Sequence, residues 1–141
     1  MDYSIKRNSD GTRIESYGRL TAAGVPDFGW QVRTYPDGRR IEEHFSRGTL
    51  NGPRLNKFPD GDFRIAVYRN GKEAGPREYW YANGRKWQEA EMKNNEMDGP
   101  GREWYRSGRP KSVFRFKSGK LIEHVEWDEK GNLLKRAPND A

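Results

Sequence analysis

The chain has 141 residues, room for one domain, and no cysteine, which excludes disulfide frameworks and thiolate metal sites. The net charge is only +6 although 34% of the residues are charged, and 32% are apolar, with 13% aromatic. This composition excludes a deep aliphatic core and predicts a thin fold held together by aromatic side chains.

The N-terminal residues 1–7 are polar, and no run of ten apolar residues occurs in the chain. Neither a secretory signal nor a transmembrane helix is therefore expected, and we predict a cytoplasmic protein. Asp10-Gly11 marks a degenerate repeat within residues 1–28, which also contain an irregular insertion. Residues 15–28 fit a loop, an irregular hairpin or a linker, and the sequence does not choose among them.

Glycines recur along the chain with a period of about 23 residues. One series marks turns: its members are Gly11, Gly38, Gly61, Gly84, Gly108 and Gly131. A second series contains Gly48, Gly71, Asn95 and Gly119, and a third consists of the Gly-Pro pairs that begin at 52, 75 and 99. Three series with one shared period indicate a repeat protein over residues 29–135.

Each repeat reads as two strands joined by a tight turn, because Asp-Gly and Asn-Gly dipeptides tolerate the positive φ that hairpin turns demand. In the repeat around Gly84, residues 77–81 and 86–92 are the expected strands and 93–100 the connector. Turn residues return about every dozen positions, which leaves no room for capped helices. We predict an all-β repeat protein, a meander of antiparallel hairpins in a twisted single-layer sheet, with a frayed tail at residues 136–141.

Aromatic residues keep the same period. One column, three residues before the turn glycine, contains Tyr35, Phe58, Tyr81 and Tyr105. A tryptophan column, four residues before it, contains Trp80, Trp104 and Trp127. Since neighbouring residues of a strand point to opposite sides, the two columns are expected to line opposite faces of the sheet.

These motifs are similar to a known repeat family. The string Phe-Ser-Arg-Gly-Thr-Leu-Asn-Gly at 45–52, continued by Phe-Pro-Asp-Gly at 58–61, resembles the second half of a MORN repeat. The Trp-Tyr-Ala-Asn-Gly version at 80–84 is more similar to the variant repeats of bacterial YwqK-type antitoxins. The resemblance covers residues 29–134, although the leading Tyr-x-Gly-x-aromatic is replaced at 41–45 and Arg54 stands where a second glycine is usual. It implies a hairpin-repeat fold and an immunity protein that binds a secreted toxin.

The sequence does not predict an enzyme. His44 and His124 are the only histidines and are eighty residues apart, so no metal site or catalytic triad is expected. Asp37 and Asp60 precede turn glycines, where an aspartate accepts local backbone hydrogen bonds. The glycines are spaced as turns rather than as a phosphate-binding loop, and no cofactor is predicted.

Basic residues concentrate between residues 102 and 120, with Glu103 as the single acid. They are Arg102, Arg106, Arg109, Lys111, Arg115, Lys117 and Lys120. Alternation in 111–117 places Phe114 and Phe116 on one face and Lys111, Val113, Arg115 and Lys117 on the other. The cluster is either a solvated face or a site for an acidic protein, an anionic lipid or a nucleic acid. A membrane is disfavoured because no amphipathic helix or lipidation motif is present, and nucleic acid because Tyr105 is expected to pack within the repeats.

The tryptophan column predicts a ridge along one face. Trp80, Trp104 and Trp127 either pack within the chain or bind a protein partner, because Trp, Tyr and Arg dominate interface energetics. A single-layer sheet cannot bury both of its faces, which favours a partner or a homodimer. We therefore predict a non-catalytic protein-binding module, with the three tryptophans and the basic cluster as candidate contact residues. The alternative is a scaffold or anion-binding module that acts through residues 102–120. The resemblance implies a toxin as the partner, and the basic excess implies that its contact surface is acidic.

Overall fold

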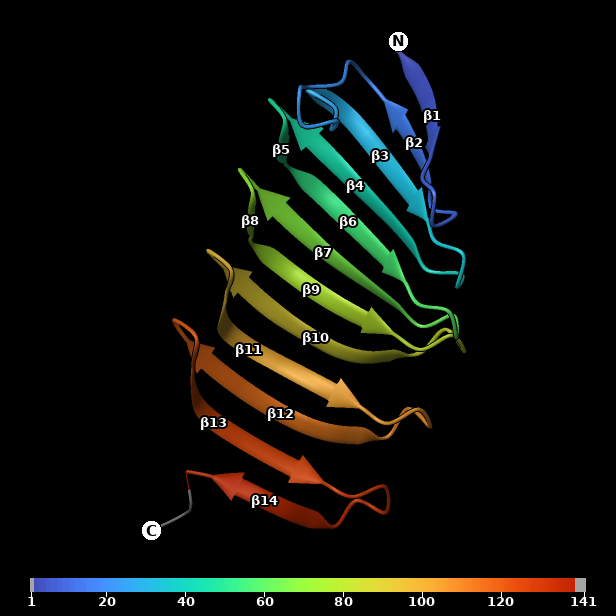
Figure 1. Ribbon diagram of the computed structural model, residues 1–141. Helices are drawn as coiled ribbons and strands as arrows, with labels where there is room; N and C mark the ends of the chain where they lie inside the picture. The colour runs from blue at the N-terminus through green and yellow to red at the C-terminus, as the bar shows by residue number, and fades with distance from the viewer. Residues whose placement is uncertain (1, 139–141) are drawn as a thin grey trace.

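The computed structural model describes residues 2–138 (Figure 1). All the strands of these residues belong to one antiparallel sheet, which confirms the all-β meander, and the described residues contain no helix. The strands are β1 (Tyr3–Arg7), β2 (Arg13–Tyr17), β3 (Phe28–Thr34), β4 (Arg40–Ser46), β5 (Thr49–Leu50), β6 (Gly52–Lys57), β7 (Phe63–Arg69), β8 (Lys72–Glu73), β9 (Gly75–Trp80), β10 (Lys86–Lys93), β11 (Glu96–Trp104), β12 (Pro110–Lys117), β13 (Lys120–Trp127) and β14 (Leu133–Ala137).

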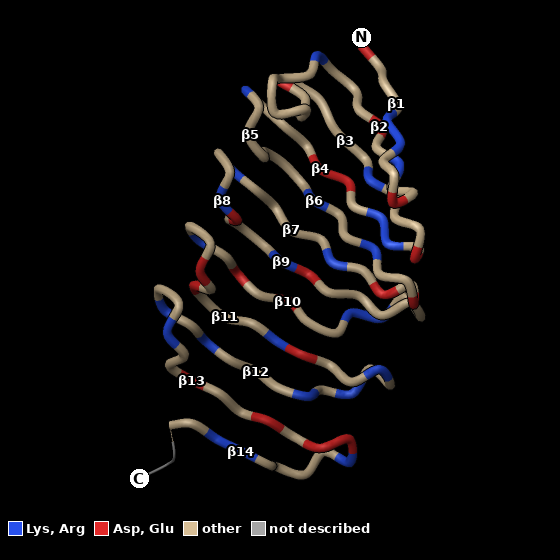
Figure 2. Tube along the Cα trace, in the orientation of Figure 1, with Lys and Arg blue, Asp and Glu red and all other residues tan. Residues whose placement is uncertain are grey.

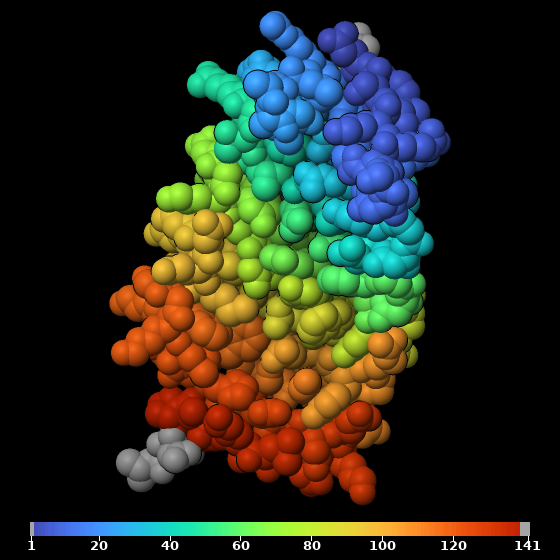
Figure 3. Space-filling view, in the orientation of Figure 1, coloured from blue at the N-terminus to red at the C-terminus, as the bar shows by residue number. Residues whose placement is uncertain are grey.

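The strands follow one another across the sheet in chain order, apart from the short β5 and β8, which pair with β4 and β7. Successive segments accordingly form consecutive bands from one end of the molecule to the other (Figure 3). β1 and β14 are the two open edges of the sheet and lie at opposite ends of it (Figure 1). Each hairpin is therefore stabilised by its immediate neighbours.

Two kinds of turn alternate along the chain. In the wide turns, such as Tyr35 to Gly38, the Gly38 N–H donates to the Tyr35 carbonyl at 3.0 Å, and the glycine has a φ of 95°. In the tight turns both central residues have positive φ, as in Asn94 (50°) and Asn95 (68°), which is the type I′ geometry.

The prediction that residues 93–100 form a connector is wrong. β10 ends at Lys93 and β11 begins at Glu96, so the second glycine series marks a further set of hairpins. The physical reason is that two residues in the left-handed region suffice to reverse an antiparallel strand. The third series lies where strands shift register. Between the pairs Phe45↔Leu50 and Glu42↔Leu55 the register changes by two residues, and Gly52 takes a φ of 112° there.

The two ends of the chain are more regular than the sequence indicates. Residues 15–17 belong to β2, and the segment that follows is an irregular turn closed by the bridge Leu20↔Pro26. At the other end, β14 continues through Ala137, which pairs with His124 of β13. Of the tail expected at 136–141, residues 139–141 lie outside the described residues.

Cross-strand pairing divides the strand residues between two faces, because directly paired residues point to the same side. We call the side of Glu43 and Ala66 the closed face and the side of Glu42 and Ile65 the open face. All buried strand residues except Val32 are on the closed face. They are Ser16, Gln31, Ile41, Glu43, Phe45, Ala66, Glu73, Ala90, Met92, Gly101, Ser112 and Phe114.

Ion pairs hold much of the closed face together. The buried Glu43 contacts the guanidinium groups of Arg33 at 3.3 Å and Arg54 at 3.0 Å. The buried Glu73 contacts those of Arg64 at 3.1 Å and Arg77 at 2.6 Å. Burial by itself raises the pKa of Glu73, but the hydrogen bonds and charges of the two arginines outweigh it and hold that pKa below its ordinary value.

Candidate protein-binding surface

The basic cluster of residues 102–120 is not one patch. Arg106 and Arg109 lie in a wide turn before β12, whereas Lys117 and Lys120 lie at the tight turn at its other end. Because β12 has eight residues, these two ends are about 26 Å apart. Arg102 and Arg115 are on strands between them.

Several members of the cluster make contacts within the repeats. Arg106 lies over the Tyr81 ring at 4.6 Å and pairs with Asp62 at 3.6 Å. Arg109 donates a hydrogen bond to the carbonyl of Glu129 at 2.9 Å. These groups therefore link successive wide turns.

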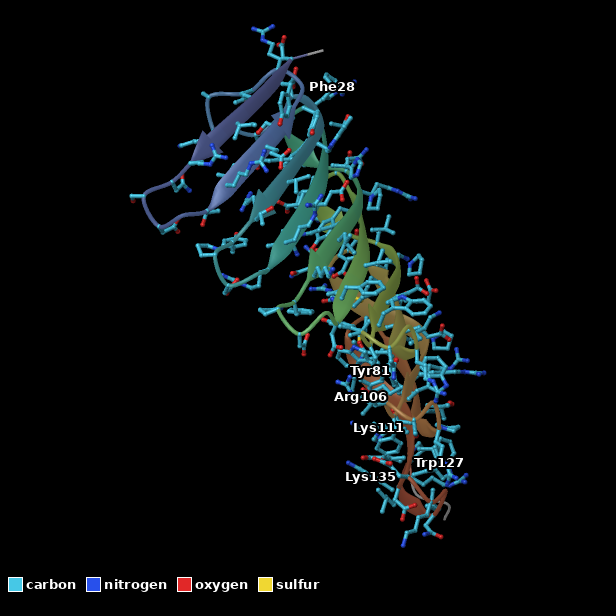
Figure 4. All side chains as sticks on the ribbon, turned by 90° about the vertical axis from the view of Figure 1, so that its right-hand side faces the viewer. Phe28, Tyr81, Arg106, Lys111, Trp127 and Lys135 are labelled. Carbon is cyan, nitrogen blue, oxygen red and sulfur yellow. The ribbon has the colours of Figure 1, made fainter. Side chains whose placement is uncertain are left out.

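Lys111 departs from the expected alternation. The pairs Glu103↔Ser112 and Trp104↔Pro110 leave it as the extra residue of a β-bulge. Its ammonium lies 5.7 Å from the centre of the Tyr105 ring. In the edge-on view Lys111 lies on the opposite side of the sheet from Trp127 (Figure 4). The prediction that it shares a face with Val113 is wrong, because a bulge changes which side the next residue faces.

The three tryptophans end β9, β11 and β13 at the wide-turn end of the sheet. Trp80 is covered on one side by the Phe63 ring, stacked at 6.1 Å, and contacted by the Lys86 ammonium at 5.1 Å. Trp104 is paired with Pro110, and Trp127 with Leu133. No contact between the three indole rings is found in residues 2–138, so they form spaced apolar positions rather than a continuous stack.

The tryptophans belong to a longer series, which we call the border row because it borders the wide turns on the open face. Pairing connects its members strand by strand from β1 to β10, and Trp104 and Trp127 continue it at equivalent positions. In spatial order the row is Arg7, Arg13, Thr34, Arg40, Lys57, Phe63, Trp80, Lys86, Trp104, Pro110, Trp127 and Leu133. Its first part is basic and its second part is aromatic and apolar.

The basic half places like charges side by side. Arg7 is directly opposite Arg13, and Arg40 is directly opposite Lys57, an arrangement that costs stability in a sheet. Arg13 has one ion pair, with Glu15 at 3.3 Å. Within residues 2–138, Arg7, Arg40 and Lys57 make none. Figure 2 shows basic positions at the wide-turn ends of the N-terminal strands.

The aromatic half carries less free charge. Its one lysine, Lys86, contacts Glu78 at 2.6 Å and Glu89 at 3.0 Å. The hydrogen bonds that Lys86 donates to these carboxylates, above all the one to Glu78, hold the pKa of Lys86 above its ordinary value. At the far end Trp127, Pro110 and Arg109 line a shallow recess of about 400 Å³. This half therefore offers apolar surface with little uncompensated charge.

A second aromatic group on the open face was missed in the sequence. Tyr17 stacks on Trp30 at 4.5 Å, and Tyr3 and His44 extend this stack to either side at 4.7 and 6.3 Å. The four rings come from β1 to β4 and stand 14, 13 and 14 residues apart, outside the period of about 23 residues. The basic half of the border row was also missed, although it has a signal. Each of its members stands four residues before or two residues after one of the turn glycines Gly11, Gly38 and Gly61.

Neither a cluster of metal-ligating side chains nor a membrane-spanning helix is found in the described residues. No group of three His, Cys, Asp or Glu in residues 2–138 is arranged to hold a metal ion. No helix long and apolar enough to cross a bilayer occurs in the same residues.

The chain was compared with known proteins. No protein-family model matches it. No curated protein matches it either. Its assignment to the MORN repeats therefore stays a prediction from the motifs.

Proposed function

We propose that this chain is a non-catalytic protein-binding module built from MORN-like repeats. The bound protein contacts the border row, with an acidic part against the basic half and an apolar part against the aromatic half. Following the resemblance to YwqK-type antitoxins, we propose that the partner is a bacterial toxin, neutralised in the cytoplasm by this contact.

The border row carries this proposal. No second layer covers the open face of residues 2–138, so the row is accessible along its whole length. Trp and Arg are the side chains that contribute most to protein interfaces, and like-charged pairs such as Arg40 and Lys57 are relieved when an acidic surface approaches. Stacking of nucleic-acid bases is a poorer fit, because Phe63 and Lys86 already contact the Trp80 ring.

The test uses two charge-matched triple variants. The first changes Arg7, Arg40 and Lys57 to Glu, and the control changes Arg102, Lys117 and Lys120 to Glu; all six side chains are exposed. Each variant is produced together with candidate toxins encoded beside this gene in the source organism, and growth is measured.

We expect the wild type and the control to restore growth and the border-row variant to fail. A Trp127→Ser variant should weaken rescue as well. Loss of rescue only in the control would show that residues 102–120 form the binding site. If no neighbouring protein is toxic, or if the wild type gives no rescue, the toxin assignment is overturned.

A further inference from the structure

The first strand of the sheet, β1, has an unpaired edge, and the residues whose backbone groups point outward from it can be identified. β1 pairs only with β2, and all five of its residues are exposed. The Asp2 carbonyl accepts a hydrogen bond from the Gly18 N–H at 2.7 Å, and the Asn8 N–H donates to the Thr12 carbonyl at 2.9 Å. The direction of the backbone N–H and C=O groups alternates along a strand. The even-numbered residues of β1 therefore point these groups toward β2.

The odd-numbered residues therefore turn their N–H and C=O groups away from the sheet. These are Tyr3, Ile5 and Arg7, whose side chains all lie on the open face. Tyr3 is 50% exposed and Ile5 is 43% exposed. Tyr3 is the last ring of the stack formed with Tyr17, Trp30 and His44, so its outer side has no ring of the described residues against it. The edge thus offers unpaired backbone groups together with an apolar residue between a ring and a cation.

We propose that β1 pairs with β1 of a second copy of this chain, antiparallel and with a two-fold axis at Ile5. Each Tyr3 then lies opposite Arg7 of the other copy, each Ser4 opposite Lys6, and Ile5 opposite itself. The three outward-facing residues of each strand exchange about six backbone hydrogen bonds across the axis. No like charges are directly opposed in this arrangement.

Other registers are poorer. A shift by one residue would bring the outward groups of one strand against the inward groups of the other. A shift by two residues in one direction would place Lys6 opposite Lys6, and in the other direction it would leave only about four backbone bonds. The axis at Ile5 is the register that combines the most backbone bonds with complementary side chains.

The pairing also joins two features of the open face. The stack that ends at Tyr3 in one copy meets the basic half of the border row that begins at Arg7 in the other. A guanidinium over a tyrosine ring is a favourable contact. A strand of five residues buries less than a standard interface, so the dimer is expected to be reversible and to form at high concentration.

Because the chain contains no cysteine, single cysteine variants report the register directly. Across an antiparallel hydrogen-bonded pair the Cα atoms are about 5.5 Å apart, within disulfide range. Under mild oxidation Ile5→Cys should form a disulfide-linked dimer, whereas Leu121→Cys, at a residue 45% exposed on β13, should not. Equal cross-linking of the two would overturn the proposal, and faster cross-linking of Ser4→Cys would overturn the register.

Sedimentation velocity of the unoxidised protein provides the second measurement. The wild type should shift toward dimer as its concentration rises. The Ile5→Lys variant would place one lysine opposite another at the axis, so it should stay monomeric with an unchanged circular dichroism spectrum. A wild type that remains monomeric at several hundred micromolar contradicts the proposal. So does a species that keeps growing beyond a dimer, because that indicates head-to-tail pairing of β1 with β14.

Discussion

The two faces of the sheet use the same kind of side chain in opposite ways. The closed-face arginines that pair with Glu43 or Glu73 are Arg33, Arg54, Arg64 and Arg77. On the open face Arg7, Arg40 and Lys57 have no ion pair among the described residues, and two of them are directly paired with each other. On the closed face a buried glutamate between two strands makes these arginines structural, whereas Arg7, Arg40 and Lys57 have no such counter-ion on the open face of residues 2–138.

The largest expected effect comes from removing a closed-face glutamate. Glu73→Gln leaves Arg64 and Arg77 without their shared counter-ion in a largely buried site. We expect the free energy of unfolding in urea to fall by about 3 kcal/mol. The control is Glu123→Gln, whose exposed contact with Arg115 at 3.9 Å should change stability by less than about 0.5 kcal/mol. Equal effects would contradict a special role for the closed face.

The contacts of Glu73 with its two arginines also predict a pH dependence of stability. The pKa of Glu73 in the folded protein lies below its ordinary value of 4.5, so its stabilisation is fully present above that value and is lost as the pH falls through the folded pKa. The difference in unfolding free energy between the wild type and Glu73→Gln should therefore shrink below about pH 4.5. Urea titrations of both proteins from pH 7 to pH 3 measure it, and a constant difference would contradict the assignment.

A smaller effect is expected at the wide turns, where the two faces meet. The Tyr81 hydroxyl donates to the Trp104 carbonyl of the next repeat at 3.0 Å. Tyr81→Phe should lower the free energy of unfolding by about 1 kcal/mol. Tyr35→Phe is the matched control at the equivalent position, which Phe58 occupies in the intervening repeat, and it should be nearly neutral. An equal or larger loss in the control would mean that the Tyr81 hydrogen bond has no special role in stability.

The smallest effect, of opposite sign, is expected on the open face. Arg40→Gln or Lys57→Gln removes one member of a like-charged pair. Unfolding free energy should stay constant or rise by about 0.5 kcal/mol at low salt, with a smaller gain at high salt. A loss of more than about 1 kcal/mol would show that these residues are structural and would remove the distinction between the faces.

The periodicity of the sequence determined the hairpin meander, because turns depend on local φ preferences that glycine, asparagine and aspartate reveal directly. The same preferences were misinterpreted at 93–100, where Asn94 and Asn95 form a turn without any glycine. The tryptophan column was likewise visible, since its members stand at one fixed distance from each turn.

Only the tertiary structure decided which side chains meet. Glu73 is buried because β8 folds against β7 and brings it to Arg64, nine residues away, and Lys111 changes sides because of a bulge. The basic half of the border row combines residues from five strands, whereas the basic run at 102–120 is divided between two ends of a hairpin. The physical reason is that the register of a strand decides which face each side chain is on and which side chains lie beside it. A shift of one residue moves every side chain that follows to the other face.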